Sequence, residues 1–446
     1  MSNESSSHIE TSGGRGKLSE AQKRDLGQLT VLYAILIVAF ISRLVDGFVA
    51  HLHLVDGAFF LALFLLVLSA RRLTVPVSWI LCVLSLYVGA LIGLVTPDIH
   101  TNFAVMPVIL AYHSVTEFLI ASIYETRYIV AMGVLLGCGL LITTDQWERL
   151  VSFILILLTG NALFIVIEYL SPRIHTIFIR HAGYAAHFSF AYRGVSLLMN
   201  AYDASMSMIF LTALSTYVWV KTRQTRYAIL VIIASISTLL LGTRSGYIGI
   251  AGYFVWLSLL SPVSLRRRIT RMLLALFGMA ASFAILALTD AKFRKIIISI
   301  GLLSDSKGSA QLHLALFLHS LHFIMLHPFG LGLGKTNFGA LTPGISYEPE
   351  SYALAIGLDG GLVALICFYY YNAKVFLNIQ KSARPGAYAI AALGLTLISL
   401  SWINIQVFGS SFVMVFLPII VAGFMSAGGL GEQRVVSQDS TVWSSV

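Results

Sequence analysis

Two arginines at the edges of apolar segments offer phosphate-binding chemistry. Arg193 precedes the apolar segment 197–220, and Arg244 follows the apolar segment 226–243. A guanidinium inside lipid is costly unless its head reaches water or meets an anion. Because the guanidinium is planar and permanently charged, its fork of donors matches two oxygens of a phosphate group. The spacing predicts one cleft in which both side chains hold a diphosphate. The alternative is that each side chain reaches the lipid headgroup zone separately.

One acid stands where it could take part in proton transfer. Glu350 lies in the stretch PGISYEPESYALAIGLDGG, next to Ser351 and three residues after Tyr347, at the start of an apolar segment. A carboxylate in this position can accept a proton from a sugar hydroxyl as a general base. Its alternative role is that of a carboxylate at a helix N-terminus, which the helix dipole stabilises, with Pro349 in the first turn.

These side chains need a scaffold, and the composition indicates helices in a membrane. Of the 446 residues, 57% are hydrophobic and 11% are charged. A stretch of about 20 apolar residues crosses a bilayer as a helix. We therefore expect an all-α polytopic membrane protein with a transmembrane domain at 28–428 and polar cytoplasmic tails at 1–27 and 429–446. Thirteen segments are candidate spans: 30–45, 55–70, 75–95, 102–121, 127–144, 150–170, 197–220, 226–243, 245–260, 269–289, 352–377, 386–405 and 410–427.

The excess of basic residues in cytoplasmic loops predicts which ends of the segments lie inside. The basic loops of the second half are Lys221, Arg223, Arg226, Arg266, Arg267, Arg268, Arg271, Lys374, Lys381 and Arg384. Their position places 171–196, the region of Arg244 and the long loop 290–351 on the outer side. If the N-terminus is cytoplasmic and each of the six segments before residue 171 crosses the membrane, residue 171 lies inside. The basic loops of the second half instead place it outside, so the two counts differ by one crossing. We therefore expect one segment between 102 and 170 to be re-entrant or interfacial, which leaves about 12 transmembrane helices with both termini inside.

The outer regions carry more positive charge than this rule explains. Their basic residues are Arg173, Arg180, Arg193, Arg244, Lys292, Arg294, Lys295, Lys307 and Lys335. The loop 290–351 contains two helical stretches, of which the first has the basic and apolar faces of a helix lying on a membrane surface. The candidate substrate-binding residues are Arg180, Arg193, Arg244, Lys335, Tyr347 and Ser351.

Other motifs favour neither a metal nor a nucleotide. His319 and His322 share a helix face, but no carboxylate or cysteine joins them at ligand spacing, so we expect no metal site. The stretch GLGLGKT looks like a phosphate loop, yet Phe329 stands where that motif needs its first glycine. The three cysteines lie in apolar segments and are expected in the core. The net charge of +9 is expected from membrane topology, without a nucleic-acid partner.

Four stretches, in this order and spacing, resemble the O-antigen polymerase and ligase superfamily of Wzy-type polymerases and WaaL-type ligases. They are YRGVSLLMNAYDASM, GTRSGYIG, GSAQLHLALFLHSLHFIMLHPFGLGLGKTNFG and ESYALAIGLDGGLVAL. The resemblance covers about residues 185–380, and the N-terminal third is similar only in being apolar. It implies a GT-C-like membrane glycosyltransferase at the periplasmic face of a bacterial inner membrane. It also implies an undecaprenyl diphosphate-linked glycan as donor and no cofactor.

The resemblance also implies roles for four catalytic candidates. Arg193 and Arg244 would hold the diphosphate and neutralise the charge that grows as the sugar leaves. Glu350 would deprotonate the acceptor hydroxyl, and His313 would orient the acceptor or the diphosphate. Ligases of this superfamily characteristically have His, usually followed by Asn, where this chain has Glu350 and Ser351. That difference favours a polymerase, whose acceptor is another lipid-linked repeat unit.

Two alternative functions fit parts of the pattern. One is an O-antigen ligase that transfers glycan to the lipid A core. The other is a flippase of lipid-linked glycans, which would need intramembrane charges along a path between both faces, whereas the charges here concentrate at one face. For the polymerase, a chain-length regulator is a candidate partner besides membrane lipid. The sequence leaves open whether the product is O-antigen, capsule or exopolysaccharide.

Overall fold

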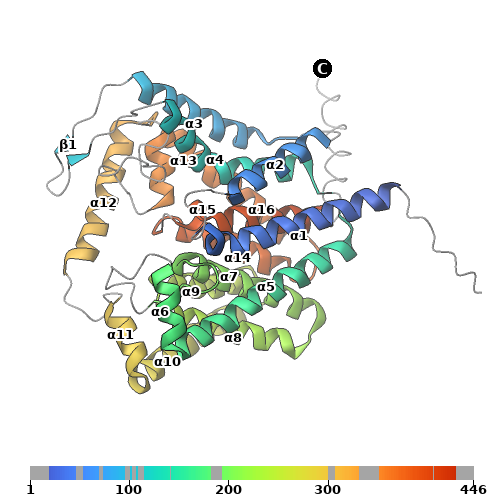
Figure 1. The fold of residues 1–446 in the computed structure, drawn as a ribbon, viewed down its shortest axis with the longest axis vertical. Helices are drawn as coiled ribbons and strands as arrows, with labels where there is room; N and C mark the ends of the chain where they lie inside the picture. Colours follow the sequence, from blue (N-terminus) through green and yellow to red (C-terminus); the bar gives the residue numbers. More distant parts are fainter. Residues whose placement is uncertain are drawn as a thin grey trace, which may run out of the picture.

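A computed structural model shows a helical protein (Figure 1). It describes residues 20–46, 54–69, 74–95, 101–102, 107–108, 115–140, 142–181, 193–299, 307–330, 351–404 and 406–427. These residues form sixteen helices and one pair of two-residue strands, so the expected all-α character is confirmed for the described part of the chain.

The first half of the chain forms six helices and the strand pair. They are α1 (Glu20–Asp46), α2 (Leu54–Ser69), α3 (Val77–Val95), β1 (Thr101–Asn102), β2 (Pro107–Val108), α4 (Val115–Cys138), α5 (Thr144–Leu170) and α6 (Pro172–His181). The rest of the chain, from Ala201 on, forms the other ten. They are α7 (Ala201–Thr222), α8 (Thr225–Leu241), α9 (Arg244–Leu260), α10 (Leu265–Thr289), α11 (Ala291–Ser299), α12 (Lys307–Leu326), α13 (Tyr352–Gln380), α14 (Ala387–Leu400), α15 (Gln406–Gly409) and α16 (Ser411–Ser426).

Several of these helices have the character of membrane spans. By length and composition, three of the described helices are able to cross a membrane, namely α5, α10 and α13, and shorter apolar helices accompany them. The expected spans coincide with twelve of the described helices: α1–α5, α7–α10, α13, α14 and α16. The membrane character of the chain is therefore supported by its helices, while the number of crossings is part of the proposal below.

The stretch between residues 102 and 170 differs from the three segments that the sequence predicts there. Its described residues hold the antiparallel strand pair, in which Thr101 pairs with Val108, followed by α4 and α5. Helix α4 starts at Val115 and runs to Cys138, so the expected segments 102–121 and 127–144 are not separate helices. The expectation that one of the segments here is re-entrant or interfacial stays a prediction, because residues 103–106 and 109–114 lie outside the described part of the structure.

Helix α7 forms the centre of the bundle and α10 lies at its edge. In α7 every residue from Asp203 to Val218 is buried, including serines and threonines that donate to carbonyls one turn earlier, as Ser205 does to Ala201 O at 2.8 Å. This local bonding satisfies hydroxyl groups inside an apolar bundle. Helix α10 has no fully buried residue: Phe283 packs against Tyr247 of α9, and much of its remaining apolar surface faces outward.

The loops that the sequence predicts in the cytoplasm gather at one end of α7. Lys221 forms an ion pair with Glu148 of α5, with 2.6 Å between Nζ and Oε1. Tyr217 donates to the same Glu148 oxygen at 3.2 Å, and Arg384 donates to Phe424 O at 2.7 Å. The Arg384 loop also packs against Tyr217, because Gly386 lies next to the backbone of Tyr217. A helix of 22 residues separates this end from the other by about 33 Å.

The helices of the expected outer loop lie at the opposite end. In Figure 1, α11 and α12 follow the same edge of the bundle, and α12 runs across the direction taken by α1 and α5. Helix α12 packs there through Ile324 against Leu354 and Leu358 of α13. The start of α13 is thus at the same end as α12.

A break in α13 admits a neighbouring loop. Gly361 has φ 75° and ψ −173° inside the helix, a conformation that other residues rarely adopt. The N–H of Leu362 donates to Pro328 O at 2.8 Å, which joins the break to the turn after α12. A Cβ on Gly361 would collide with the backbone of Pro328 and Phe329. The sequence GG in this helix therefore serves backbone contact.

We predict that Gly361→Ala destabilises the protein, because the new Cβ is strained by the positive φ and blocked by Pro328. The expected cost is about 2 kcal/mol or more. The control is Gly278→Ala in α10, where nothing lies within 4 Å of an added Cβ. Thermal unfolding in detergent should show a lower midpoint for Gly361→Ala alone. Equal midpoints for both variants would contradict the close contact.

Candidate functional site

The segment that carries Arg193 is a compact turn before α7. The backbone of Ser196 and Met199 has φ 59° and 51°, an uncommon conformation for residues with side chains. Asn200 N–H donates to Val195 O at 3.1 Å and closes the turn. The Asn200 side chain then caps α7 by accepting from Tyr202 N–H at 2.8 Å. The turn is therefore tied to the first residues of the central helix.

A buried carboxylate holds this turn from the side of α5. Glu168 is 0% exposed, and its two oxygens accept from Val195 N–H at 3.1 Å and from Ser196 N–H at 2.9 Å. His175 of α6 contacts the same carboxylate, with 3.1 Å between Nδ1 and Oε1. Hydrogen bonds to an ionised acceptor are stronger than neutral ones, and they offset the burial of its charge. Glu168 thus joins α5, α6 and the Arg193 turn.

Arg244 is placed by the corner between α8 and α9. Helix α8 ends at Gly242, whose φ of 71° and ψ of 34° form a left-handed cap. Thr243 then caps α9 by accepting from Gly246 N–H at 3.2 Å, so Arg244 is the first residue of the new helix. The corner leaves the guanidinium of Arg244 half-buried at the end of the bundle.

One backbone hydrogen bond joins the turn to the corner. Gly194 N–H donates to Leu241 O at 3.2 Å. Gly194 is next to Arg193, and Leu241 is three residues before Arg244. This bond brings the two arginines together from segments about 50 residues apart. The structure thus places the two segments side by side, and the expectation that both side chains share one binding place stays a prediction.

The two charges affect one another. Burial lowers the pKa of the Arg193 guanidinium, its hydrogen bond to Tyr202 opposes that shift, and the charge of Arg244 lowers the pKa further. An arginine stays protonated in spite of such a shift because its ordinary pKa is above about 12. The fold therefore holds two positive charges near each other where water is partly excluded.

A lysine from the outer loop lies close by. Tyr169 donates through its hydroxyl to Asp290 at the corner between α10 and α11, and that bond lowers the pKa of the Asp290 carboxyl. Lys292 donates to the carbonyl of Tyr169, and its Nζ lies 4.3 Å from the centre of the Tyr169 ring. Burial lowers the pKa of Lys292, whereas the charges of Glu168 and Asp290 raise it. These contacts dock α11 on the end of α5.

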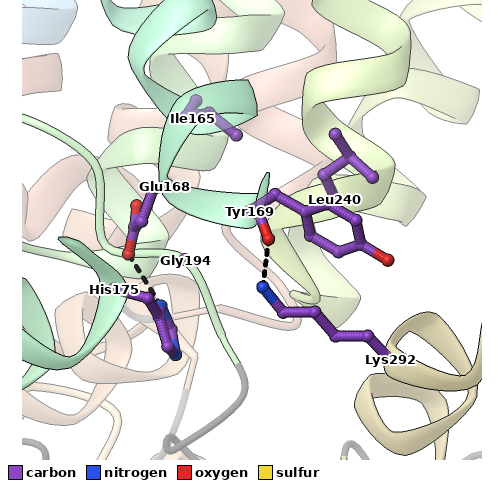
Figure 2. A pocket seen from close by; sticks show the side chains of 7 residues that line it. All are labelled: Ile165, Glu168, Tyr169, His175, Gly194, Leu240 and Lys292. Carbon is purple, nitrogen blue, oxygen red and sulfur yellow. Dashed lines mark hydrogen bonds and ion pairs between the residues drawn. The ribbon is translucent and has the colours of Figure 1, made fainter. Parts of the chain in front are cut away.

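Figure 2 shows the small pocket that these groups surround. It has about 190 Å³ of empty space, its open mouth included, and its lining residues are Ile165, Glu168, Tyr169, His175, Gly194, Leu240 and Lys292. His175 and Glu168 point toward each other on one side, and Lys292 reaches the Tyr169 carbonyl on the other. The Glu168–His175 pair therefore lies on one side of the pocket and the Lys292 ammonium group on the other. The pocket itself adjoins the Arg193 turn.

Comparisons with known proteins add nothing to this geometry. No family model, no curated protein and no solved structure matches the chain. The resemblance described above therefore rests on its four stretches alone. Among the described residues, no group of three or more histidine, cysteine, aspartate or glutamate side chains is placed to hold a metal ion.

The other predicted site residues fall in three groups. Arg180 is exposed in the last turn of α6. Ser351 is buried and caps α13, accepting from Leu354 N–H at 3.3 Å and donating to Ser401 O at 3.2 Å, so its hydroxyl has a structural role. His313 lies in α12, but its side chain is outside the described part of the structure. Lys335, Tyr347, Pro349 and Glu350 lie outside the described residues, and the described part of α13 starts at Tyr352.

Glu168 is the site residue that the sequence interpretation missed. It is an acid near the end of the apolar stretch LFIVIEYL, and an ionisable residue in such a stretch is a functional candidate by default. The sequence also contained no sign that Tyr202 bonds to Arg193 or that Lys292 lines the pocket with Gly194, because only the fold brings α7 and α11 to this point.

We predict that inorganic diphosphate stabilises the protein, because an anion between Arg193 and Arg244 relieves their mutual repulsion. Millimolar diphosphate should raise the unfolding midpoint by about 2–5 °C. Arg244→Gln should lose most of this increase. Arg226→Gln, an exposed arginine at the far end of α8, should keep it. The same increase in all three proteins would show that the anion acts elsewhere.

Proposed function

We propose that the chain is a membrane glycosyltransferase that polymerises undecaprenyl diphosphate-linked repeat units at the periplasmic face of a bacterial inner membrane. The observation that carries this proposal is the close approach of Arg193 and Arg244 at one end of an apolar helical bundle. Both arginines are held by backbone geometry, and a diphosphate offers the charge and the oxygens that two guanidinium groups bind.

The membrane arrangement in this proposal follows from the two ends of the bundle. Helices α1–α5, α7–α10, α13, α14 and α16 cross the membrane, which makes twelve spans with both termini inside. The end with Lys221 and Arg384 faces the cytoplasm, in agreement with the excess of positive charge expected there. The end with Arg193 and Arg244 then faces the periplasm, together with α11 and α12. Some of these helices have 14–17 residues, so the bilayer around them is thinned or they are tilted little.

The charge at this end supports an anionic substrate. Arg193, Arg244 and Lys292 are cations with partly buried side chains. The buried acid among them, Glu168, already accepts from two backbone N–H groups and contacts His175. The excess of positive charge in a site shielded from water favours a ligand with two or more negative charges.

The reaction that we propose is a displacement at the anomeric carbon of the donor. The hydroxyl oxygen of the acceptor sugar forms a bond to that carbon, and the bond from the carbon to the diphosphate oxygen breaks. The acceptor proton passes to Glu350, and the diphosphate leaves on its lipid with its charge neutralised by Arg193 and Arg244. No nucleotide or metal is needed for this balance, because the diphosphate is already the leaving group.

The position of α13 agrees with this role for Glu350. The residue after Glu350 is Ser351, which donates to Ser401 O at the end of α14. Leu400, which precedes Ser401, packs on α9. Its Cδ1 lies 2.9 Å from the place that a Cβ added at Gly249 would take. Gly249 is five residues after Arg244. The start of α13 is therefore at the same end of the bundle as the arginines.

We predict that Arg244→Ala abolishes chain extension. The loss of a charge-stabilising donor costs about 100-fold or more in rate. In a strain that lacks the native gene, the variant should leave single repeat units on the polymer's carrier, and unextended lipid-linked units should accumulate. Arg226→Ala, which removes the same charge from the opposite end of α8, should restore polymer of normal length.

Three results would contradict the polymerase. Full-length polymer from a correctly inserted Arg244→Ala protein would remove the arginines from the chemistry. Complete absence of attached repeat units in the deletion strain would instead indicate a ligase. Lipid-linked units that stay on the cytoplasmic leaflet would indicate transport.

A further inference from the structure

We infer that Glu168 is a positioning residue for Arg193: its carboxylate fixes the turn that holds the guanidinium beside Arg244. This inference rests on the proposed function, because it concerns how the diphosphate site is formed. It gives a role to a buried acid for which the proposed reaction has no use.

Two backbone N–H groups of the Arg193 turn donate to Glu168. Val195 N–H and Ser196 N–H each bind a different oxygen of the carboxylate, at 3.1 and 2.9 Å. Both residues follow Arg193 within three positions. Two bonds from consecutive N–H groups to one carboxylate fix both the place and the direction of the backbone. Arg193 therefore cannot shift along α7 without breaking one of them.

A short piece of the turn connects the Glu168 contact to the corner that carries Arg244. Gly194 stands between the carboxylate and the corner of α8 and α9, and its N–H binds Leu241 O. A Cβ at this position would lie 3.1 Å from Leu241 Cδ2 and 3.4 Å from Glu168 Oε2. The backbone of the turn is therefore packed closely between the two anchors, so the Glu168 contact and the Arg244 corner are linked by three residues of chain.

The negative charge of Glu168 interacts with neighbouring side chains. His175 lies at 3.1 Å from its carboxylate, and Lys292 of α11 is close enough for the two charges to interact. The neutral side chain of glutamine would remove the negative charge that interacts with Lys292. Its amide NH₂ would also face one of the two backbone N–H donors, so at most one of those bonds survives.

A second anchor keeps the turn attached when Glu168 is changed. Asn161, two helical turns earlier on α5, accepts from Leu197 N–H at 3.2 Å and donates to Ser207 Oγ at 3.0 Å. This neutral contact lies further from Arg193 than the Glu168 contact. We therefore expect a Glu168 variant to fold, with the Arg193 end of the turn displaced.

The test measures binding of undecaprenyl diphosphate to the purified full-length protein in lipid nanodiscs. Glu168→Gln should raise the Kd about 10-fold. Glu148→Gln makes the same chemical change at the other end of α5 and should leave the Kd within about 2-fold of the wild type. Because Glu168 acts through Arg193, Glu168→Gln should have no further effect in a protein that already carries Arg193→Gln. A structural role would lower the unfolding midpoint and would not produce this coupling.

The outcomes separate the inference from the proposed function. If the wild type does not bind the lipid diphosphate, both are wrong. If the wild type binds it and Arg193→Gln weakens binding, two results overturn the inference alone: an unchanged Kd for Glu168→Gln, or effects of the two substitutions that simply add. Should Glu168→Gln fail to fold, Glu168→Asp replaces it, since aspartate keeps the charge but is one methylene too short to reach both N–H groups. The same coupling to Arg193 is then required.

Discussion

The proposed site depends on holding the two positive charges of Arg193 and Arg244 near each other against their repulsion. Arg193 and Arg244 belong to separate parts of the chain, and neither would stay near the other in an unconstrained loop. The backbone bond from Gly194 to Leu241 and the carboxylate of Glu168 fix the two segments. An arrangement that costs free energy in the unbound protein is typical of a site that is completed by an anion.

The bundle provides the rest of the constraint by keeping the Lys221 region and the Arg193 turn at different ends. Helix α7 is buried along almost its full length and separates the Lys221–Glu148 pair from the Arg193 turn. Helix α13 is broken where it packs closely against a neighbouring backbone, whereas much of the apolar surface of α10 is exposed. In Figure 1, α11 and α12 lie along one edge of the bundle, and α11 docks on the end of α5 through the contact between Lys292 and Tyr169.

Much of the scaffold was predictable because apolar segments carry a strong signal. The positions of Arg193 and Arg244 at segment boundaries predicted that they would meet, since boundary residues on one side of a membrane share a surface. Hydropathy suggested a boundary between residues 121 and 127, but α4 runs through it from Val115 to Cys138, because hydropathy does not distinguish two short segments from one helix. Glu168 was missed because its donors are backbone groups of a turn 27 residues away, and no side-chain pattern reports such a contact.

The most direct measurement is an experimental structure of the protein in nanodiscs with undecaprenyl diphosphate bound. Our account expects density for the two phosphate groups within hydrogen-bond distance of both guanidinium groups, with Glu168 still bound to the Arg193 turn. Density for the headgroup at another place, with Arg193 and Arg244 turned toward lipid or toward other protein groups, would contradict it.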